Sequence, residues 1–202
     1  MTIAILVGHF GKGTGNSWND RDEYEWAWMD AHTISKMLEG LGHRVIMGYV
    51  DRDDIRDRAF AMEFAEKGGL KDRNHAIRAN MAIVAKADCA VEFHYNGFTD
   101  TSVKGHEVLI DNDEPEGSKS EVLARQIHDN LSIVMPLHPQ RGVKRQRLIV
   151  TELLRRAGIP CCLVEPAFLF ESILEDRRVF CGPYYKAVVD AIEAFGKSGG
   201  TA

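Results

Sequence analysis

Four polar side chains stand at places in the chain where they could act together. His9, His94 and Glu165 each come at the end of a short apolar segment, and Glu23 follows the glycine-rich stretch after His9. Two histidines and one carboxylate are a frequent ligand set for a catalytic zinc ion, which keeps a further position for water. These residue types therefore indicate a metal site built from distant parts of the chain.

A catalytic metal of this kind needs a separate group that moves protons. Zn2+ lowers the pKa of bound water from about 15.7 to about 7, and a carboxylate then takes the proton and delivers it to the leaving amine. Glu165 is the candidate, because Pro166 favours an extended backbone that holds the Glu165 side chain beside the strand end. This combination favours hydrolysis by metal-activated water.

The elements that must position these residues follow from the apolar periodicity. Buried strands are expected at Ile3–Val7, Arg44–Val50, Cys89–His94, Gly105–Ile110 and Pro160–Glu165. Helices are expected at Asp22–Leu41, at Asp72–Lys86, after the capping box Ser118-x-x-Glu121 and at Tyr184–Phe195, with a short surface helix within Asp51–Lys67. This order predicts an α/β fold with a mostly parallel sheet that helices cover on both faces. The carboxyl ends of parallel strands share one edge, where sites form.

The composition narrows the class of protein. The chain has 202 residues, 45% of them apolar and 27% charged, and its net charge is -5. These values are typical of one globular domain, which we place at residues 1–195, with a flexible tail at 196–202. No apolar run approaches the roughly 20 residues of a membrane span, and the acidic balance argues against nucleic acid as a partner. We expect a monomer with reduced, packed thiols at Cys89, Cys161, Cys162 and Cys181.

Several segments carry short motifs of one known family, and they are spread over nearly the whole chain. They are Ile5–Gly15, Asp22–Tyr24, Leu38–Gly42, Ala87–Asn96, Gly105–Val108, Arg141–Lys144 and Pro160–Phe168. Through them the sequence resembles the zinc-dependent N-acetylmuramoyl-L-alanine amidases, in particular the catalytic domains of phage endolysins and bacterial autolysins. The resemblance implies a twisted six-stranded sheet with helices on both sides. It also implies that His9, Glu23 and His94 bind Zn2+ and that Glu165 is the catalytic acid/base.

The resemblance further implies a substrate and a place of action. The substrate would be peptidoglycan, cleaved at the amide between N-acetylmuramic acid and L-alanine. Met1–Gly8 carries no basic segment and no cleavage site, so we expect synthesis in the cytoplasm without a signal peptide. Action on the cell wall after release, as by a phage lysin, fits this expectation.

Other polar residues near these motifs could have a purely structural role instead of a functional one. Glu25 cannot share a helix face with Glu23, and we expect Glu23 to be the ligand because it stands at the helix start. Glu92 lies on the same strand face as His94, where it could orient that histidine or pair with an arginine; we favour a supporting role.

Four further residues are candidates for the substrate groove. Asn96 could donate a hydrogen bond to peptide carbonyls of the substrate, and Arg141 could meet its acidic groups. Trp18, in a polar loop, could contact substrate. His106 could line the groove too, but we expect it to be a partly exposed strand histidine.

Three alternatives remain open from the residues alone. The same ligands would serve another zinc amidohydrolase or peptidase acting on small substrates. A non-catalytic wall-binding module with structural zinc would have no need of Glu165 as a proton carrier. A non-haem iron oxygenase also uses two histidines and a carboxylate, but its close His-x-Asp/Glu pair is missing here.

Overall fold

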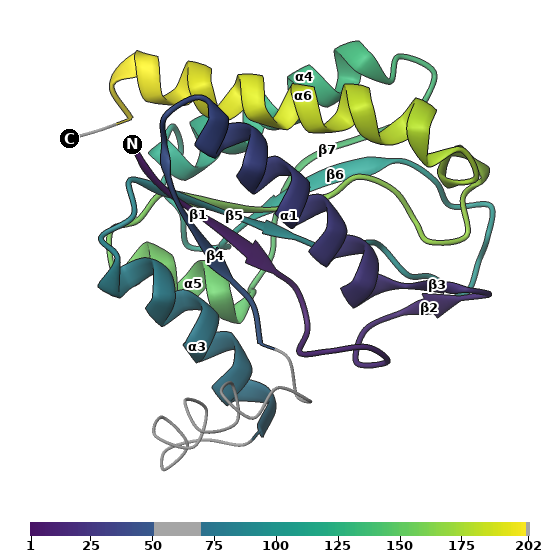
Figure 1. Ribbon diagram of the computed structural model, residues 1–202, viewed down its shortest axis with the longest axis horizontal. Coiled ribbons are helices and arrows are strands. Elements are labelled where there is room, and N and C mark those ends of the chain that lie inside the picture. Colours follow the sequence, from purple (N-terminus) through teal and green to yellow (C-terminus); the bar gives the residue numbers. More distant parts are fainter. Residues whose placement is uncertain (51–69, 201–202) are drawn as a thin grey trace.

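Six strands form one sheet in the computed structural model, which describes residues 1–50 and 70–200 (Figure 1). They stand in the order β4-β1-β5-β8-β6-β7. Their bounds are β1 Thr2–Val7, β4 Arg44–Gly48, β5 Cys89–Phe93, β6 His106–Ile110, β7 Gln140–Arg145 and β8 Cys161–Glu165. A separate two-stranded ribbon joins β2, Ser17–Trp18, to β3, Arg21–Asp22.

The direction of the strands decides which residues meet at the edge of the sheet. β4, β1, β5 and β8 run parallel, β6 pairs antiparallel with β8, and β7 runs parallel to β6. The ends of β1, β5 and β8 therefore lie at the same edge as the start of β6. This mixed six-stranded sheet confirms the expected fold class.

Helices cover both faces of the sheet (Figure 1). One face carries α1 (Glu23–Gly40), α4 (Lys119–Val134) and α6 (Arg177–Phe195), and the other carries α3 (Leu70–Val84) and α5 (Ile149–Arg156). A 3-10 turn at Ser172–Leu174 precedes α6. None of the helices in residues 1–50 and 70–200 is long and apolar enough to cross a membrane.

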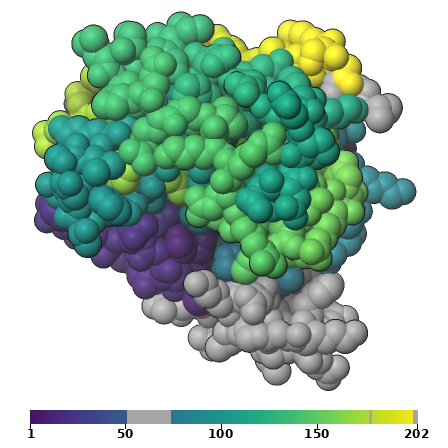
Figure 2. Space-filling model, turned by 180° about the vertical axis from the view of Figure 1, so that it is seen from behind, coloured from purple at the N-terminus to yellow at the C-terminus, as the bar shows by residue number. Residues whose placement is uncertain are grey.

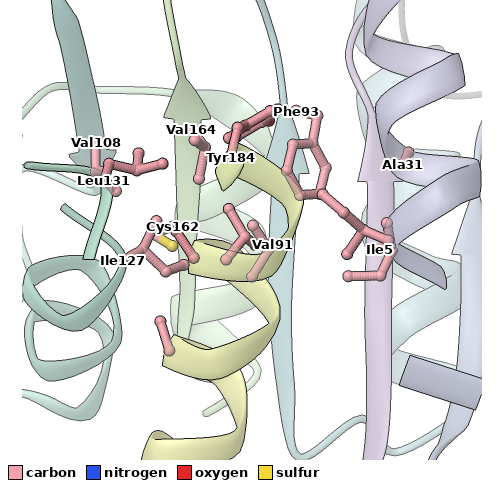
Figure 3. Packing of buried hydrophobic residues seen from close by; sticks show 14 of the residues in the cluster. Ile5, Ala31, Val91, Phe93, Val108, Ile127, Leu131, Cys162, Val164 and Tyr184 are labelled. Carbon is pink, nitrogen blue, oxygen red and sulfur yellow. The ribbon is translucent and has the colours of Figure 1, made fainter. Parts of the chain in front are cut away.

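The alternation of side chains along the strands builds two apolar layers. Val91, Phe93 and Val164 point toward α4 and α6, where they pack with Tyr184 (Figure 3). Smaller residues such as Ala4 face α3 and α5.

The cysteines follow the same alternation. Cys161 and Cys162 lie in different layers, as expected for neighbours on a strand. All four cysteines are buried and free, which confirms the expectation of packed thiols.

The start of α1 is defined by its cap. Asp22 has an extended backbone, and its side chain accepts a hydrogen bond of 3.1 Å from the backbone N–H of Glu25. Glu23 is thereby fixed as the first residue of the helix and is turned into the molecule. The helix ends at Gly40, two residues before Gly42, whose φ of +88° suits glycine.

Three elements differ from the expectations. β7 and α5 were not expected as a strand and a helix, and α6 begins at Arg177, well before Tyr184, with Pro183 inside it. The surface helix expected within Asp51–Lys67 lies outside the described residues. After Phe195 the chain continues through one helical turn, Gly196–Gly200, so the division into a domain and a flexible tail remains a prediction.

Candidate metal centre and catalytic carboxylates

The structure brings the three expected metal ligands together at the edge of the sheet. His9 follows β1, His94 follows β5, and Glu23 begins α1. One ligand atom from each lies within 4.8 Å of the others. Oε1 of Glu23 is 2.9 Å from Nε2 of His9 and 2.9 Å from Nδ1 of His94. The two imidazole rings meet edge to face, with centroids 4.9 Å apart.

Glu23 is buried and is held from several sides. Its Oε2 accepts hydrogen bonds of 2.8 Å from both the backbone N–H and the side-chain amide of Asn16. Its Oε1 accepts one of 3.2 Å from the backbone N–H of Tyr95. Burial raises the pKa of Glu23, but hydrogen bonds with His9 and His94 outweigh it and hold that pKa well below its usual range. The carboxylate is therefore ionised and rigid, as a metal ligand must be.

His94 lies between two carboxylates. Its Nδ1 faces Glu23, and its Nε2 lies 3.5 Å from Oε1 of Glu92. Burial lowers the pKa of His94, but its contacts with Glu23 and Glu92 outweigh burial and raise the pKa to about 10. A carboxylate on the second ring nitrogen is the usual way to fix the tautomer and orientation of a ligand histidine.

Arg78, on α3, is a part of the site that sequence analysis missed. Its side chain is fully buried, and its Nη2 lies 2.8 Å from Oε1 of Glu92. Its Nη1 donates to the backbone carbonyl of His9 and, over 3.2 Å, to Oδ1 of Asn74. Glu92 thus contacts both Arg78 and His94. The two options that the sequence left for Glu92, to orient His94 or to pair with an arginine, are therefore both realised. The signal in the sequence was a buried glutamate on β5, which requires a buried cation.

Two glycines, which have no side chain, make room for the metal-ligand side chains. A Cβ on Gly8 would overlap the ring of His94. A Cβ on Gly15 would lie 2.7 Å from Cδ2 of His9 and 2.8 Å from Oε2 of Glu23. Between them His9 has a φ of 64°, which is uncommon for a residue with a side chain. The first loop is therefore shaped around the three ligands.

The donor set fits a divalent cation. Nε2 of His9 is buried and has no hydrogen bond of acceptable geometry, although it lies close to Glu23. An orphaned nitrogen, a second imidazole and an ionised carboxylate directed at one point match the ligands that zinc prefers.

Glu165 ends β8 beside this group. The backbone N–H of His94 donates to the carbonyl of Val164 over 3.0 Å, so Glu165 comes next to His94 in the neighbouring strand. Across the antiparallel pair its register partner is Glu107. Burial raises the pKa of Glu165, the negative charges of Glu107 and Glu23 add to the effect, and His94 opposes it. The result is a carboxyl whose pKa lies well above its usual range.

Glu107 has the opposite environment. Its Oε2 accepts from Nε of Arg141 over 2.8 Å and from Nζ of Lys144, and its Oε1 accepts from the amide of Asn96 over 3.0 Å. Burial raises the pKa of Glu107, but these donors outweigh it and lower that pKa. Two neighbouring carboxyls with pKa values moved in opposite directions can hold one proton between them.

The two residues expected to bind substrate lie at the same edge. Asn96 and Arg141 both contact Glu107, so each has a partner within the protein. The guanidinium of Arg141 also lies over the ring of Phe168, 5.2 Å from its centroid. Their contact with substrate remains a prediction.

The expectation for His106 was wrong. The side chain is fully buried, with Nε2 3.2 Å from Oγ of Ser132 and Nδ1 3.4 Å from Nδ1 of His138. His138 in turn contacts Oε2 of Glu171 over 2.8 Å. Burial, together with His128 and His138, lowers the pKa of His106 to about 4. The cause is α4, which packs over the start of β6 and brings Ser132 and His128 against the His106 ring.

The family profile described as N-acetylmuramoyl-L-alanine amidase matches residues 3–194. The chain belongs to the N-acetylmuramoyl-L-alanine amidase family. The family expected from the sequence motifs is therefore confirmed. No curated protein sequence matches the chain.

Solved structures of other amidases share the fold of this amidase-family chain. The CwlD amidase of Clostridioides difficile, in complex with the GerS lipoprotein, has a TM-score of 0.78 at 21% identity over 98% of both chains. An N-acetylmuramoyl-L-alanine amidase of Clostridium difficile 630 has a TM-score of 0.73 at 23% identity, over 98% of this chain and 97% of its own. The catalytic domain of the CD27L endolysin, which targets Clostridia difficile, has a TM-score of 0.71 at 19% identity, over 96% and 97%.

Proposed function

We propose that this chain hydrolyses the amide bond between N-acetylmuramic acid and L-alanine in peptidoglycan, with Zn2+ held by His9, Glu23 and His94. The observation that carries the proposal is the convergence of the three ligand atoms within 4.8 Å, next to the carboxyl pair of Glu107 and Glu165. Membership of the amidase family supports the choice of bond.

The ligands perform distinct tasks in this proposal. Glu23 supplies negative charge, and His94 is oriented by Glu92 through its second nitrogen. Bound there, Zn2+ would supply the Lewis acidity that polarises an amide carbonyl and lowers the pKa of water. Arg78 holds the backbone carbonyl of His9 and the carboxylate of Glu92, so it keeps both histidines in place without touching the substrate.

Glu165 moves the proton. In its ionised form it accepts a proton from the attacking water, and burial beside the charged Glu107 favours the protonated form that results. The proton then passes to the nitrogen of the leaving L-alanine, whose free amine has a pKa of about 8. A raised pKa on Glu165 is therefore suited both to the uptake of the proton from water and to its delivery to the leaving amine.

The alternatives are weaker on specific grounds. A wall-binding module with structural zinc would have no use for a carboxyl such as Glu165, whose pKa is raised by burial and by a neighbouring carboxylate, because its charged form is costly. A zinc peptidase acting on small substrates could use the same ligands, and the products of digestion distinguish it. We further propose that the chain acts as a monomer on the cell wall after release, as a phage lysin does.

Mass spectrometry of digested peptidoglycan tests the proposal. The expected products are peptides with a free L-alanine amino terminus and glycan strands that retain the lactyl carboxylate. EDTA should abolish their release, and added Zn2+ should restore it. New reducing sugar ends, or cleavage only within the stem peptide, would assign a different bond and overturn the proposal.

A further inference from the structure

A pocket of about 380 Å³ lies beside the metal centre. It is formed by the β2 segment, the loop that follows β5 and the segment after β8, three parts of the chain that are distant in sequence. In Figure 2 the purple N-terminal segment and the teal loop after β5 meet at the lower left. Its size is that of a pocket that takes a small-molecule group.

Aromatic side chains form the walls of this pocket. Trp18 is 41% exposed and Phe98 is 59% exposed, although both are large and apolar. Phe170 contacts Trp18 edge to face, with ring centroids 5.7 Å apart, and stacks on the buried Phe168. The aromatic wall therefore rests on the core and has open faces toward the pocket.

Two asparagines connect the pocket to the catalytic residues. Asn16 lines it and also donates to Glu23 through its side-chain amide, and Asn96 lines it and donates to Glu107. A Cβ on Gly97 would overlap the side chain of Asn16, so the loop before β2 touches the loop that follows β5. A group in the pocket would thus lie next to the bond that is cleaved.

The pocket differs in charge from the residues next to it. None of the side chains that line the pocket is ionisable. Arg141 and Lys144 both contact Glu107, to which the pocket residue Asn96 also donates, and their side chains remain 29% and 40% exposed. The pocket suits an uncharged ligand, and the Arg141 side suits an acidic one.

We propose that this pocket binds an N-acetylated sugar ring of the glycan strand and so sets the direction in which substrate lies. The inference rests on the proposed function. On the sugar side of the scissile amide the substrate is uncharged, with apolar C–H faces and amide groups that suit an aromatic wall with Asn16 and Asn96. On the peptide side it carries carboxylates, which would lie toward Arg141.

Binding of a peptide-free sugar tests the pocket without any catalysis. The probe is a tetramer of N-acetylglucosamine, titrated into the full chain and followed by NMR at the indole N–H of Trp18. We expect saturable shifts at Trp18, and binding about fivefold to tenfold weaker in Phe98→Ala. Leu137→Ala, at a residue that is 98% exposed and outside the pocket, should bind as the parent does. Absence of shifts at Trp18 would overturn the proposal. So would displacement of the bound sugar by a sugar-free stem peptide.

Kinetics on paired substrates provide a second test. One substrate carries the disaccharide on the muramoyl group, and the other carries only the lactyl group on the same peptide. Trp18→Ala should raise KM about fivefold to tenfold for the first and leave the second unchanged, and Trp18→Phe should restore the first. An equal change for both substrates would contradict a sugar site. If no amide is cleaved, the proposed function fails, and the titration still decides whether the pocket binds sugar.

Discussion

Glu107 and Glu165 are direct register partners across the antiparallel strands β6 and β8. Glu107 is neutralised by Arg141 and Lys144, whereas burial and the neighbouring carboxylates raise the pKa of Glu165 against the opposing effect of His94. The pair therefore separates into one carboxylate that stays charged and one that can take a proton. β6 has to run antiparallel to β8 for this contact to form.

Glu107→Gln should change the pH dependence of hydrolysis. Removing a negative charge lowers the pKa of Glu165, because that charge raises it in the parent. Since the base must be ionised to accept a proton, activity will persist to lower pH in the variant. The profile of kcat/KM against pH should show its acidic limb displaced to lower pH, with zinc content unchanged. An acidic limb that stays in place would show that Glu107 does not influence the base.

Glu165→Gln should remove catalysis and leave the metal. The amide keeps the size of the side chain but cannot accept the proton, so kcat should fall about 10²–10⁴-fold. Zinc content and the unfolding temperature should stay near those of the parent, because Glu165 is not among the ligand atoms. Digestion of cell walls at the parent rate by a metal-loaded variant would rule out its role.

Glu23→Gln and Glu25→Gln form a matched pair. Glu23 is buried between the two histidines, whereas Glu25 is partly exposed and its Oε1 lies 2.9 Å from Nζ of Lys12. A neutral amide in place of Glu23 should weaken zinc binding strongly. The same change at Glu25 should have little effect, since an exposed ion pair is screened by solvent and contributes little. Competition with a chromogenic chelator measures both affinities, and the reverse order would reassign the ligand.

Gly15→Ala tests the shape of the first loop. The new methyl group would press on the ring of His9 and the carboxylate of Glu23, so zinc affinity should fall although no ligand is removed. Gly40→Ala is the control, because nothing lies within 4 Å of a Cβ there. It should leave zinc affinity unchanged. Equal affinity in both variants would mean that the loop tolerates the methyl group.

His106 should make the fold sensitive to acid. Its pKa is about 4 in the folded chain against about 6.5 when unfolded, so between these values only the unfolded chain binds the proton. Stability should therefore fall as pH drops from about 6.5 to about 4, by about 3 kcal/mol at most. Urea unfolding across this range should give a flatter pH dependence for His106→Gln than for the parent. Identical slopes would assign the acid sensitivity to other groups.

The sequence could predict the elements that carry long apolar signals. Strands ending at Val7, Phe93 and Glu165 were identifiable, and their parallel pairing brings the residues that follow them to one edge. The edge strand β7 was not identifiable from the sequence, because Gln140–Arg145 is polar and only partly buried. Its pattern does not alternate as that of a half-buried strand does.

Contacts between distant segments account for the rest of what was missed. The ion pair of Arg78 with Glu92 and the pairing of Glu107 with Glu165 each join elements whose spatial order no local pattern reveals. His106 has an ordinary strand setting in the sequence, and only the packing of α4 against β6 buries it. The candidate ligands, by contrast, stand directly at strand and helix ends, where local signals are strongest.

The first strand separates the beginning of the chain from the reactive edge. Its six residues span roughly 20 Å at about 3.3 Å per residue, and Gly196, just after α6, packs against Met1 at the far end (Figure 1). A bead, a dye or a carrier protein joined at Met1 would thus project away from the metal centre. Immobilised through such a handle, the chain would still present its open side to an insoluble polymer.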